Sequence, residues 1–177
     1  MNAQFDPAFY WMLPHEGRFQ RRVADPGNWT GGKIGVGDLK GTKFGIAAAS
    51  YPDLDIENLT INEAHDIYLR DYWNTQKYAE LIFQVPANKI FDLVVNMGFS
   101  GGHKVVQRAL IDCGHPVGVD GVFGILTLDA CNSIQPDELI ETICLRAEER
   151  YRDIVRANPN AAENLEGWLT RARAVPV

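Results

Sequence analysis

Seven glycines lie between Gly27 and Gly45, and this stretch limits the fold more than any other part of the chain. Glycine adopts backbone conformations that other residues disfavour, so a dense run of glycines predicts turns and close backbone approaches. The short Val and Ile segments between them predict a small irregular hairpin within a loop. Apolar residues before and after this stretch recur at helical spacing. The sequence therefore predicts a mainly α protein with a small loop and β-hairpin lobe.

Apolar spacing also sets the positions of the expected helices. A first helix is expected at residues 6–15, and Thr60 with Glu63 forms a capping box before another. Residues 86–97 are apolar at nearly every inner position, so we expect this helix at the centre of the core, ended by Gly98. Other helices are expected at residues 45–50, 103–113, 127–132, 136–158 and 161–174.

Composition excludes several classes of function. The chain has 177 residues and a formal net charge of −6, with no basic cluster beyond Arg21-Arg22. Nucleic-acid binding needs a basic surface to neutralise phosphates, so we expect no nucleic-acid partner. No apolar run reaches the roughly 18 residues that span a bilayer. The N-terminus lacks the basic start, apolar core and cleavage site of a signal peptide, so we expect synthesis in the cytoplasm.

Cysteines and histidines give no sign of a metal site. Cys113, Cys131 and Cys144 lie in apolar helical segments without ligand spacing, which favours free buried thiols over a disulfide. The four histidines show no pattern such as HExxH. A phosphate-binding glycine loop and a nucleophile elbow are also missing from the sequence. We therefore expect no metal and no other cofactor.

Two acids near the N-terminus differ in their surroundings. Glu16 ends an apolar helical run, and both the negative end of the helix dipole and the apolar neighbours favour its protonated form. Asp25 lies in an open polar turn before Pro26, where the ionised form is favoured. Glycoside hydrolysis needs such a pair, because one carboxyl donates a proton and the other stays charged. The plain alternatives are a solvated acid at a helix end and an ordinary Asp-Pro-Gly turn.

Several strings of residues resemble glycoside hydrolase family 108, the muramidases of phage endolysins and secretion activators. Near the N-terminus these are residues 15–19, 25–32 and 41–46, and further on they are 68–73, 91–98, 120–124 and 167–171. The chain departs from the family pattern at Arg18 and Phe19, where Gly-Tyr is common, and at Ala47. The resemblance implies a lysozyme-like muramidase region at residues 1–98. It also implies a helical peptidoglycan-binding region at residues 99–177, packed against the first.

The resemblance also implies a reaction and the residues that perform it. The expected substrate is the β-1,4 bond between N-acetylmuramic acid and N-acetylglucosamine in peptidoglycan. Glu16 is the expected general acid, Asp25 and Thr42 are expected to position or polarise water, and Asp38 is the reserve second carboxylate. A carboxyl separation of about 5 to 5.5 Å predicts retention, and about 6.5 to 9.5 Å predicts inversion. A carboxylate with a water-holding threonine favours inversion.

Substrate contacts are expected from aromatic and amide side chains. Trp29, Tyr72, Trp73 and Phe99 are candidates for stacking on sugar rings, although Tyr72 at helical spacing is favoured as a core residue. Phe44 is expected as a further substrate contact. Asn96 is polar within an apolar helix, so it is either a hydrogen-bonding core residue or a donor to an N-acetyl group. The expected partners are peptidoglycan glycan strands and a holin or other export partner. We expect a monomer that acts in the periplasm or on the cell wall after release.

Two other functions stay open at this point. A lytic transglycosylase also needs one catalytic acid, but it closes the sugar onto its own hydroxyl without using water. A protein that binds the cell wall or assists secretion has the same landmarks without turnover. A cell-wall peptidase is disfavoured, because the sequence offers neither a zinc pattern nor a Cys and His pairing.

Overall fold

The computed structural model describes residues 2–176 and confirms a mainly α fold with one small hairpin. The chain divides into two compact units. Unit 1 takes the described part of Met1–Met12 and Trp73–Val177, and unit 2 is Leu13–Tyr72. Within the described residues, no helix combines the length and apolar character needed to cross a bilayer.

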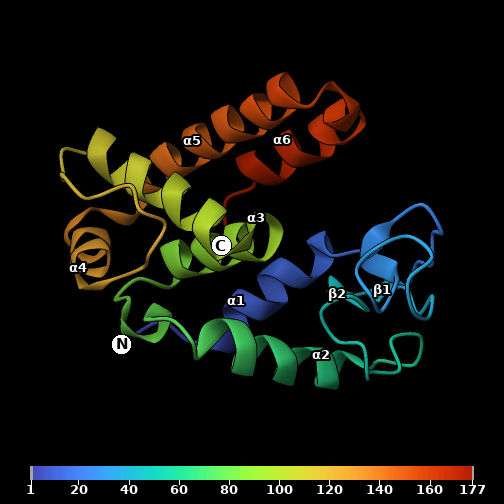
Figure 1. Cartoon of the computed structure of the whole chain (residues 1–177). Helices are drawn as coiled ribbons and strands as arrows, with labels where there is room; N and C mark the ends of the chain where they lie inside the picture. The colour runs from blue at the N-terminus through green and yellow to red at the C-terminus, as the bar shows by residue number, and fades with distance from the viewer. Residues whose placement is uncertain (1, 177) are drawn as a thin grey trace. The chain divides into compact units, whose positions relative to one another are not determined.

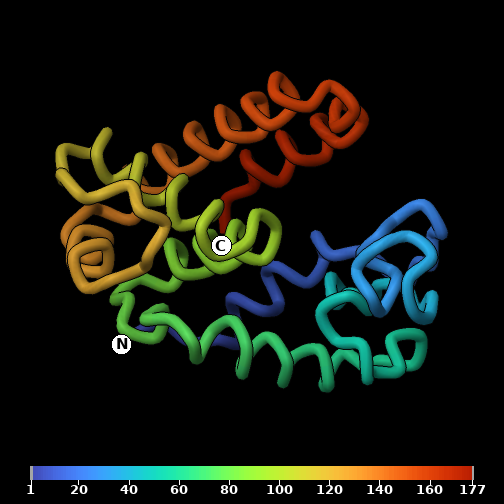
Figure 2. Tube along the Cα trace, in the orientation of Figure 1, coloured from blue at the N-terminus to red at the C-terminus, as the bar shows by residue number. Residues whose placement is uncertain are grey.

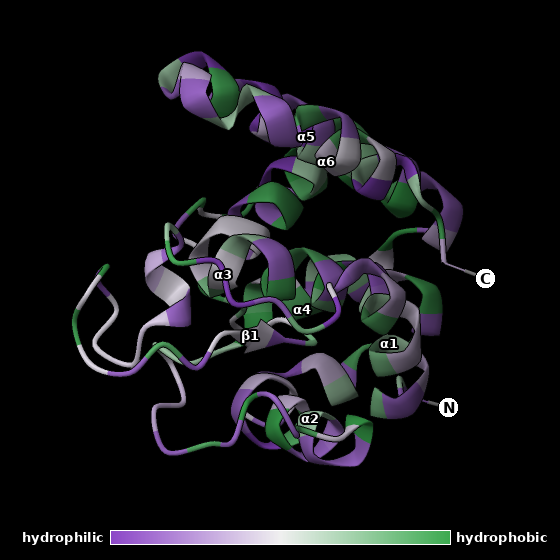
Figure 3. Ribbon diagram, turned by 90° about the vertical axis from the view of Figure 1, so that its right-hand side faces the viewer, coloured by the Kyte–Doolittle hydropathy of each residue, from purple (hydrophilic) through white to green (hydrophobic). Residues whose placement is uncertain are grey.

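Unit 1 consists of helices, and Figure 1 shows α5 running alongside α6. Its elements are α1 (Phe5–Met12), η4 (Tyr78–Glu80), α3 (Gln84–Asp112), α4 (Ile125–Ser133), α5 (Pro136–Ala157), η5 (Pro159–Asn164) and α6 (Leu165–Arg173). The start of α5 at Pro136 agrees with the sequence, because proline suits the first turn of a helix. Figure 3 shows α5 as a mixture of hydrophilic and hydrophobic patches, as expected for a helix with one buried face.

Helix α3 forms the centre of unit 1. Ile90, Leu93 and Val94 are fully buried, which confirms the expected core helix. Gly98 interrupts α3 with a left-handed φ of 73°. Glycine accepts this conformation without strain, so the two expected helices are joined across a kink instead of a loop. The three cysteines of this unit are free thiols, and Cys131 is buried.

Charged groups are also buried in unit 1. Arg171 donates to the carboxylate of Asp92 at 2.9 Å, and Asp92 is fully buried. The ammonium of Lys89 is equally buried and donates to the carbonyl oxygens of Arg171, Ala172 and Ala174 at 2.7 to 2.9 Å. These carbonyls lie at the end of α6, where a helix leaves acceptors unpaired. Lys89 therefore caps the last helix from within the core.

Unit 2 is mostly loop, as the blue and cyan part of the tube in Figure 2 shows. Its elements are η1 (Leu13–His15), η2 (Pro26–Asn28), β1 (Thr42–Lys43), β2 (Ile46–Ala47) and α2 (Ile61–Tyr68), and the short π-helix η3 (Leu69–Trp73) leads out of it. The capping box is confirmed, since Thr60 accepts from the Glu63 N–H and Glu63 accepts from the Thr60 N–H.

Strands β1 and β2 form an antiparallel hairpin in which Thr42 faces Ala47. The two turn residues, Phe44 and Gly45, have φ values of 52° and 76°. Two-residue hairpin turns need positive φ at their central positions, and glycine takes it without cost whereas phenylalanine does not. The expected helix at residues 45–50 is therefore wrong, because Gly45 turns the chain back along β1 before a helix can begin.

Candidate active site

Glu16 directly follows η1 in unit 2, and its N–H donates to Leu13 O at 3.1 Å. Its side chain is half-buried and rests against the hairpin turn. A methyl group built on Gly45 would lie only 2.6 Å from Glu16 Oε2. Only glycine at this position lets the carboxyl come so close to the turn backbone.

Two tyrosines border Glu16. Tyr68 is buried at the end of α2, and its hydroxyl donates to Phe44 O at 2.9 Å. The same methyl group on Gly45 would lie 2.5 Å from Tyr68 Oη, so this hydroxyl and the Glu16 carboxyl flank one point. Burial raises the pKa of Tyr72, with further contributions from the charges of Asp71 and Glu16.

The loop after Glu16 runs along the hairpin. Phe44 N donates to Gly17 O at 3.0 Å, and Gln20 exchanges two backbone hydrogen bonds of 2.9 Å with Thr42. Residues 17–20 thus add a third, strand-like segment beside β1. This pairing brings Glu16 and Thr42 into one small region although 26 positions separate them in the chain.

A buried amide network holds Thr42. The Thr42 hydroxyl donates to Asn28 Oδ1 at 2.7 Å, and Asn28 is fully buried. Asn28 Nδ2 donates to Gln20 Oε1 at 2.8 Å and to Arg22 O at 2.9 Å, which fixes the orientation of the amide. Because a carbonyl oxygen cannot donate, Thr42 gives its only hydroxyl hydrogen to Asn28. The lone pairs of its oxygen stay available to accept a hydrogen bond from another group, such as water.

Asp25 belongs to the same network. Its Oδ1 accepts from the Gly27 N–H at 2.9 Å, which caps the short helix η2, and its Oδ2 accepts from Gln20 Nε2 at 3.2 Å. Asp25 therefore has the turn-stabilising role that the Asp-Pro-Gly sequence allows. Gln20 and Asn28 also connect Asp25 to Thr42, and this connection was not foreseen from the sequence.

Trp29 and Phe44 are half-buried in unit 2. The Trp29 indole donates to Val23 O at 2.9 Å, which fixes its ring in the loop. The ammonium of Lys43 lies 5.5 Å from the centre of the Phe44 ring. Asp38 is exposed in the glycine-rich loop.

Trp73 and Asn96 both lie in unit 1. Trp73 is only 4% exposed, and its ring packs 5.6 to 5.7 Å from those of Phe5, Tyr78 and Phe91. A sugar-stacking ring needs an open face, so Trp73 is a core residue and is not kept as a substrate contact. Asn96 is exposed, and its Oδ1 accepts from the Tyr151 hydroxyl at 2.7 Å.

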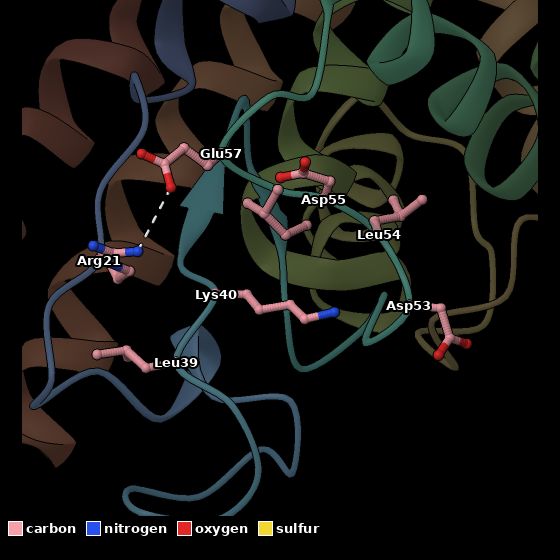
Figure 4. Close-up of a pocket in the computed structure, with 8 residues that line it drawn as sticks. Arg21, Leu39, Lys40, Asp53, Leu54, Asp55 and Glu57 are labelled. Carbon is pink, nitrogen blue, oxygen red and sulfur yellow. Dashed lines mark ion pairs between the residues drawn. The ribbon is translucent and has the colours of Figure 1, made fainter.

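A charged pocket of about 260 Å³ opens elsewhere on unit 2, as Figure 4 shows. It is lined by Arg21, Leu39, Lys40 and residues 53–57, a set different from the candidate catalytic residues. Arg21 pairs with Glu57 at 3.6 Å, and both side chains are more than half exposed. Among residues 2–176, no three His, Cys, Asp or Glu side chains are grouped so as to hold a metal ion.

Comparison with known proteins gives two family matches and a similar structure. Residues 9–98 match the family described as glycosyl hydrolase 108, and residues 101–173 match a predicted peptidoglycan domain. The compact units divide the chain differently, since residues 73–98 of the first match lie in unit 1.

Among solved structures, the chain is similar to SagA of Brucella abortus, with a TM-score of 0.69 and 23% identity. The similarity covers 95% of this chain and 88% of that one, and it shows a shared lysozyme-like fold. No curated protein matches the chain. The first family match covers more than half of the residues. The chain therefore belongs to the glycosyl hydrolase 108 family and is a glycoside hydrolase that acts on peptidoglycan.

Proposed function

We propose that the protein is an N-acetylmuramidase that cleaves the β-1,4 bond between N-acetylmuramic acid and N-acetylglucosamine, with Glu16 as the general acid. The observation that carries this proposal is the placement of Glu16. Its half-buried carboxyl rests on the backbone of Gly45 next to the Tyr68 hydroxyl, inside the region that matches the hydrolase family. A fixed carboxyl is what proton donation to a departing sugar oxygen requires.

Thr42 and Asp25 support the attack of water. Thr42 gives its hydrogen to Asn28, so its oxygen is suited to accept a hydrogen bond from a water molecule. Asp25 keeps Gln20 in place and adds negative charge to the same network. Water held apart from the acid attacks the far face of the sugar, so the reaction inverts the anomeric configuration. Asp38 is the alternative to Asp25 as the second carboxylate.

Further contacts hold the glycan strand. Within unit 2, Trp29 stacks on a sugar ring and Phe44 contacts the substrate in this proposal. Asn96 of unit 1 is a separate proposed donor to an N-acetyl group. Residues 1–98 supply the chemistry, and residues 99–177 grip peptidoglycan, as the second family match supports. The protein works as a monomeric endolysin. It is made in the cytoplasm and reaches the cell wall through a holin or another export partner.

Digestion of purified peptidoglycan tests the reaction type. We expect products with reducing ends in mass spectrometry, and NMR of the first products is expected to give the inverted anomer. Products with anhydro ends would instead mean a lytic transglycosylase. Pelleting with sacculi without any released product would mean a wall-binding protein. Asp25→Asn and Asp38→Asn, compared in the same assay, tell which carboxylate serves as the second.

A further inference from the structure

The hairpin turn beside Glu16 is strained. Phe44 has a φ of 52°, in the left-handed region that residues other than glycine rarely adopt. Such a conformation persists only where the surrounding structure holds it, and it is concentrated at functional sites. The contacts that hold Phe44 are therefore expected to serve the site and not only the hairpin.

Tyr68 supplies one of these contacts. Its hydroxyl is buried and donates to Phe44 O at 2.9 Å, while Phe44 N donates to Gly17 O. Tyr68 is the last residue of α2, and its side chain is held by a helix whose start is fixed by the Thr60 capping box. The strained turn is thus tied to a regular element and not only to neighbouring loops.

The same hydroxyl lies next to the candidate acid. A methyl group on Gly45 would meet Tyr68 Oη at 2.5 Å and Glu16 Oε2 at 2.6 Å. The turn backbone is therefore the surface against which the Glu16 carboxyl rests. If the turn relaxes, this surface moves, and the carboxyl loses its fixed position.

We infer that Tyr68 is a positioning residue for the reaction, which acts by holding the strained turn at Phe44 and Gly45 against Glu16. The inference rests on the proposed role of Glu16. It adds a residue that acts through the backbone of the turn. A displacement of about 1 Å in a catalytic group can lower turnover by roughly 100-fold, so a single hydrogen bond to the turn is sufficient to control activity.

Tyr68→Phe tests the inference because it removes only the hydroxyl and keeps the ring. The matched control is Tyr51→Phe in the same unit, whose hydroxyl donates to Asp71 at 2.9 Å instead of to the turn. With a soluble peptidoglycan oligosaccharide, we expect kcat to fall about 10- to 100-fold for Tyr68→Phe, with KM changed less than about twofold. Tyr51→Phe is expected to keep kcat within about twofold of the wild type.

A pair of glycine variants gives an independent test. Gly45→Ala forces a methyl group against both Tyr68 and Glu16, whereas Gly35→Ala meets no atom within 4 Å. Both glycines have left-handed φ values, 76° and 78°, so both variants place alanine at a similar positive φ. We expect Gly45→Ala to lose activity as Tyr68→Phe does, and Gly35→Ala to keep it. All rates are measured below the melting temperature of each variant, with folding checked by circular dichroism.

Glu16→Gln in the same assay separates the two proposals. If Glu16→Gln is inactive but Tyr68→Phe keeps as much kcat as Tyr51→Phe, the positioning role is overturned and the general acid stands. If a folded Glu16→Gln protein is fully active, the proposed acid fails and the positioning role fails with it. A drop in kcat for Tyr68→Phe and Gly45→Ala alone, with an inactive Glu16→Gln, supports both.

Discussion

Different interactions stabilise the interior of each of the two units. In unit 1, helices pack apolar faces around α3, Asp92 and Arg171 form a buried ion pair, and Lys89 donates to backbone carbonyls at the end of α6. In unit 2, the elements are short, and single hydrogen bonds such as Thr42 to Asn28 fix the loops. A packed helical core has many redundant contacts. A loop network has few, so each bond sets the position of a particular group.

This difference explains where chemistry is found. All candidate catalytic residues lie in unit 2, where open loops allow polar groups to face a substrate. Packing in unit 1 supplies stability, and buried polar groups there, such as Asp92 and Arg171, bond to one another within the core. Changes in unit 1 should therefore act mainly on stability, and changes in unit 2 mainly on activity.

Asp92→Ala is expected to have the largest effect on stability. It leaves the Arg171 guanidinium buried without its carboxylate, which typically costs about 3 to 5 kcal/mol. Urea unfolding followed by circular dichroism measures the loss. Lys77→Ala, which breaks an exposed ion pair with Glu80, is the control and should cost less than about 1 kcal/mol. Equal losses for the two variants would contradict the description of unit 1.

Asn28→Ala, in unit 2, is expected to lower both stability and activity. It removes the hydrogen bonds that Asn28 makes with Gln20, the Arg22 carbonyl and Thr42, at a cost of about 1 to 3 kcal/mol, and frees the Thr42 hydroxyl to rotate. Turnover should therefore fall even at temperatures where the variant is folded. Asn58→Ala removes an exposed asparagine of the same unit and should change stability by less than about 0.5 kcal/mol. Unchanged turnover in folded Asn28→Ala would disconnect the network from catalysis.

The smallest expected effect concerns pH. Hydrogen bonds from Arg70 hold the pKa of Asp71 below its usual range, and the Tyr51 hydroxyl adds to this. The stability gained is fully present above the unfolded pKa of about 4 and is lost as pH falls through the lower folded pKa. Melting temperatures of the wild type and Asp71→Asn should therefore converge below about pH 4. A difference that is the same at pH 3 and pH 7 would refute this assignment.

The sequence was sufficient for most helices and for the family. The capping box at Thr60, the proline at position 136 and the break at Gly98 each have a local cause, so each was predicted correctly. The helix predicted at residues 45–50 was wrong. The alanines there favour a helix locally, but the positive φ of Gly45 turns the chain into the hairpin.

Contacts between side chains that are distant in the sequence could not be predicted from local sequence patterns. Asn28 and Gln20 sit in an irregular loop, and their pairing with Thr42 depends on how the whole loop folds. Tyr68 reads as an ordinary inner residue of α2, and nothing in its spacing indicates that its hydroxyl meets the turn. Trp73 was misjudged for the opposite reason, since an aromatic residue near a helix end is equally suited to a core or a surface.

The central claim is that Glu16 donates the proton that releases the sugar. The most direct measurement is the rate of reducing-end release from purified peptidoglycan by Glu16→Gln, beside Glu57→Gln as an exposed acid of the same unit. We predict that Glu16→Gln keeps the melting temperature of the wild type and loses at least about 100-fold in rate, while Glu57→Gln stays active. A folded Glu16→Gln protein that works at the wild-type rate would contradict the claim.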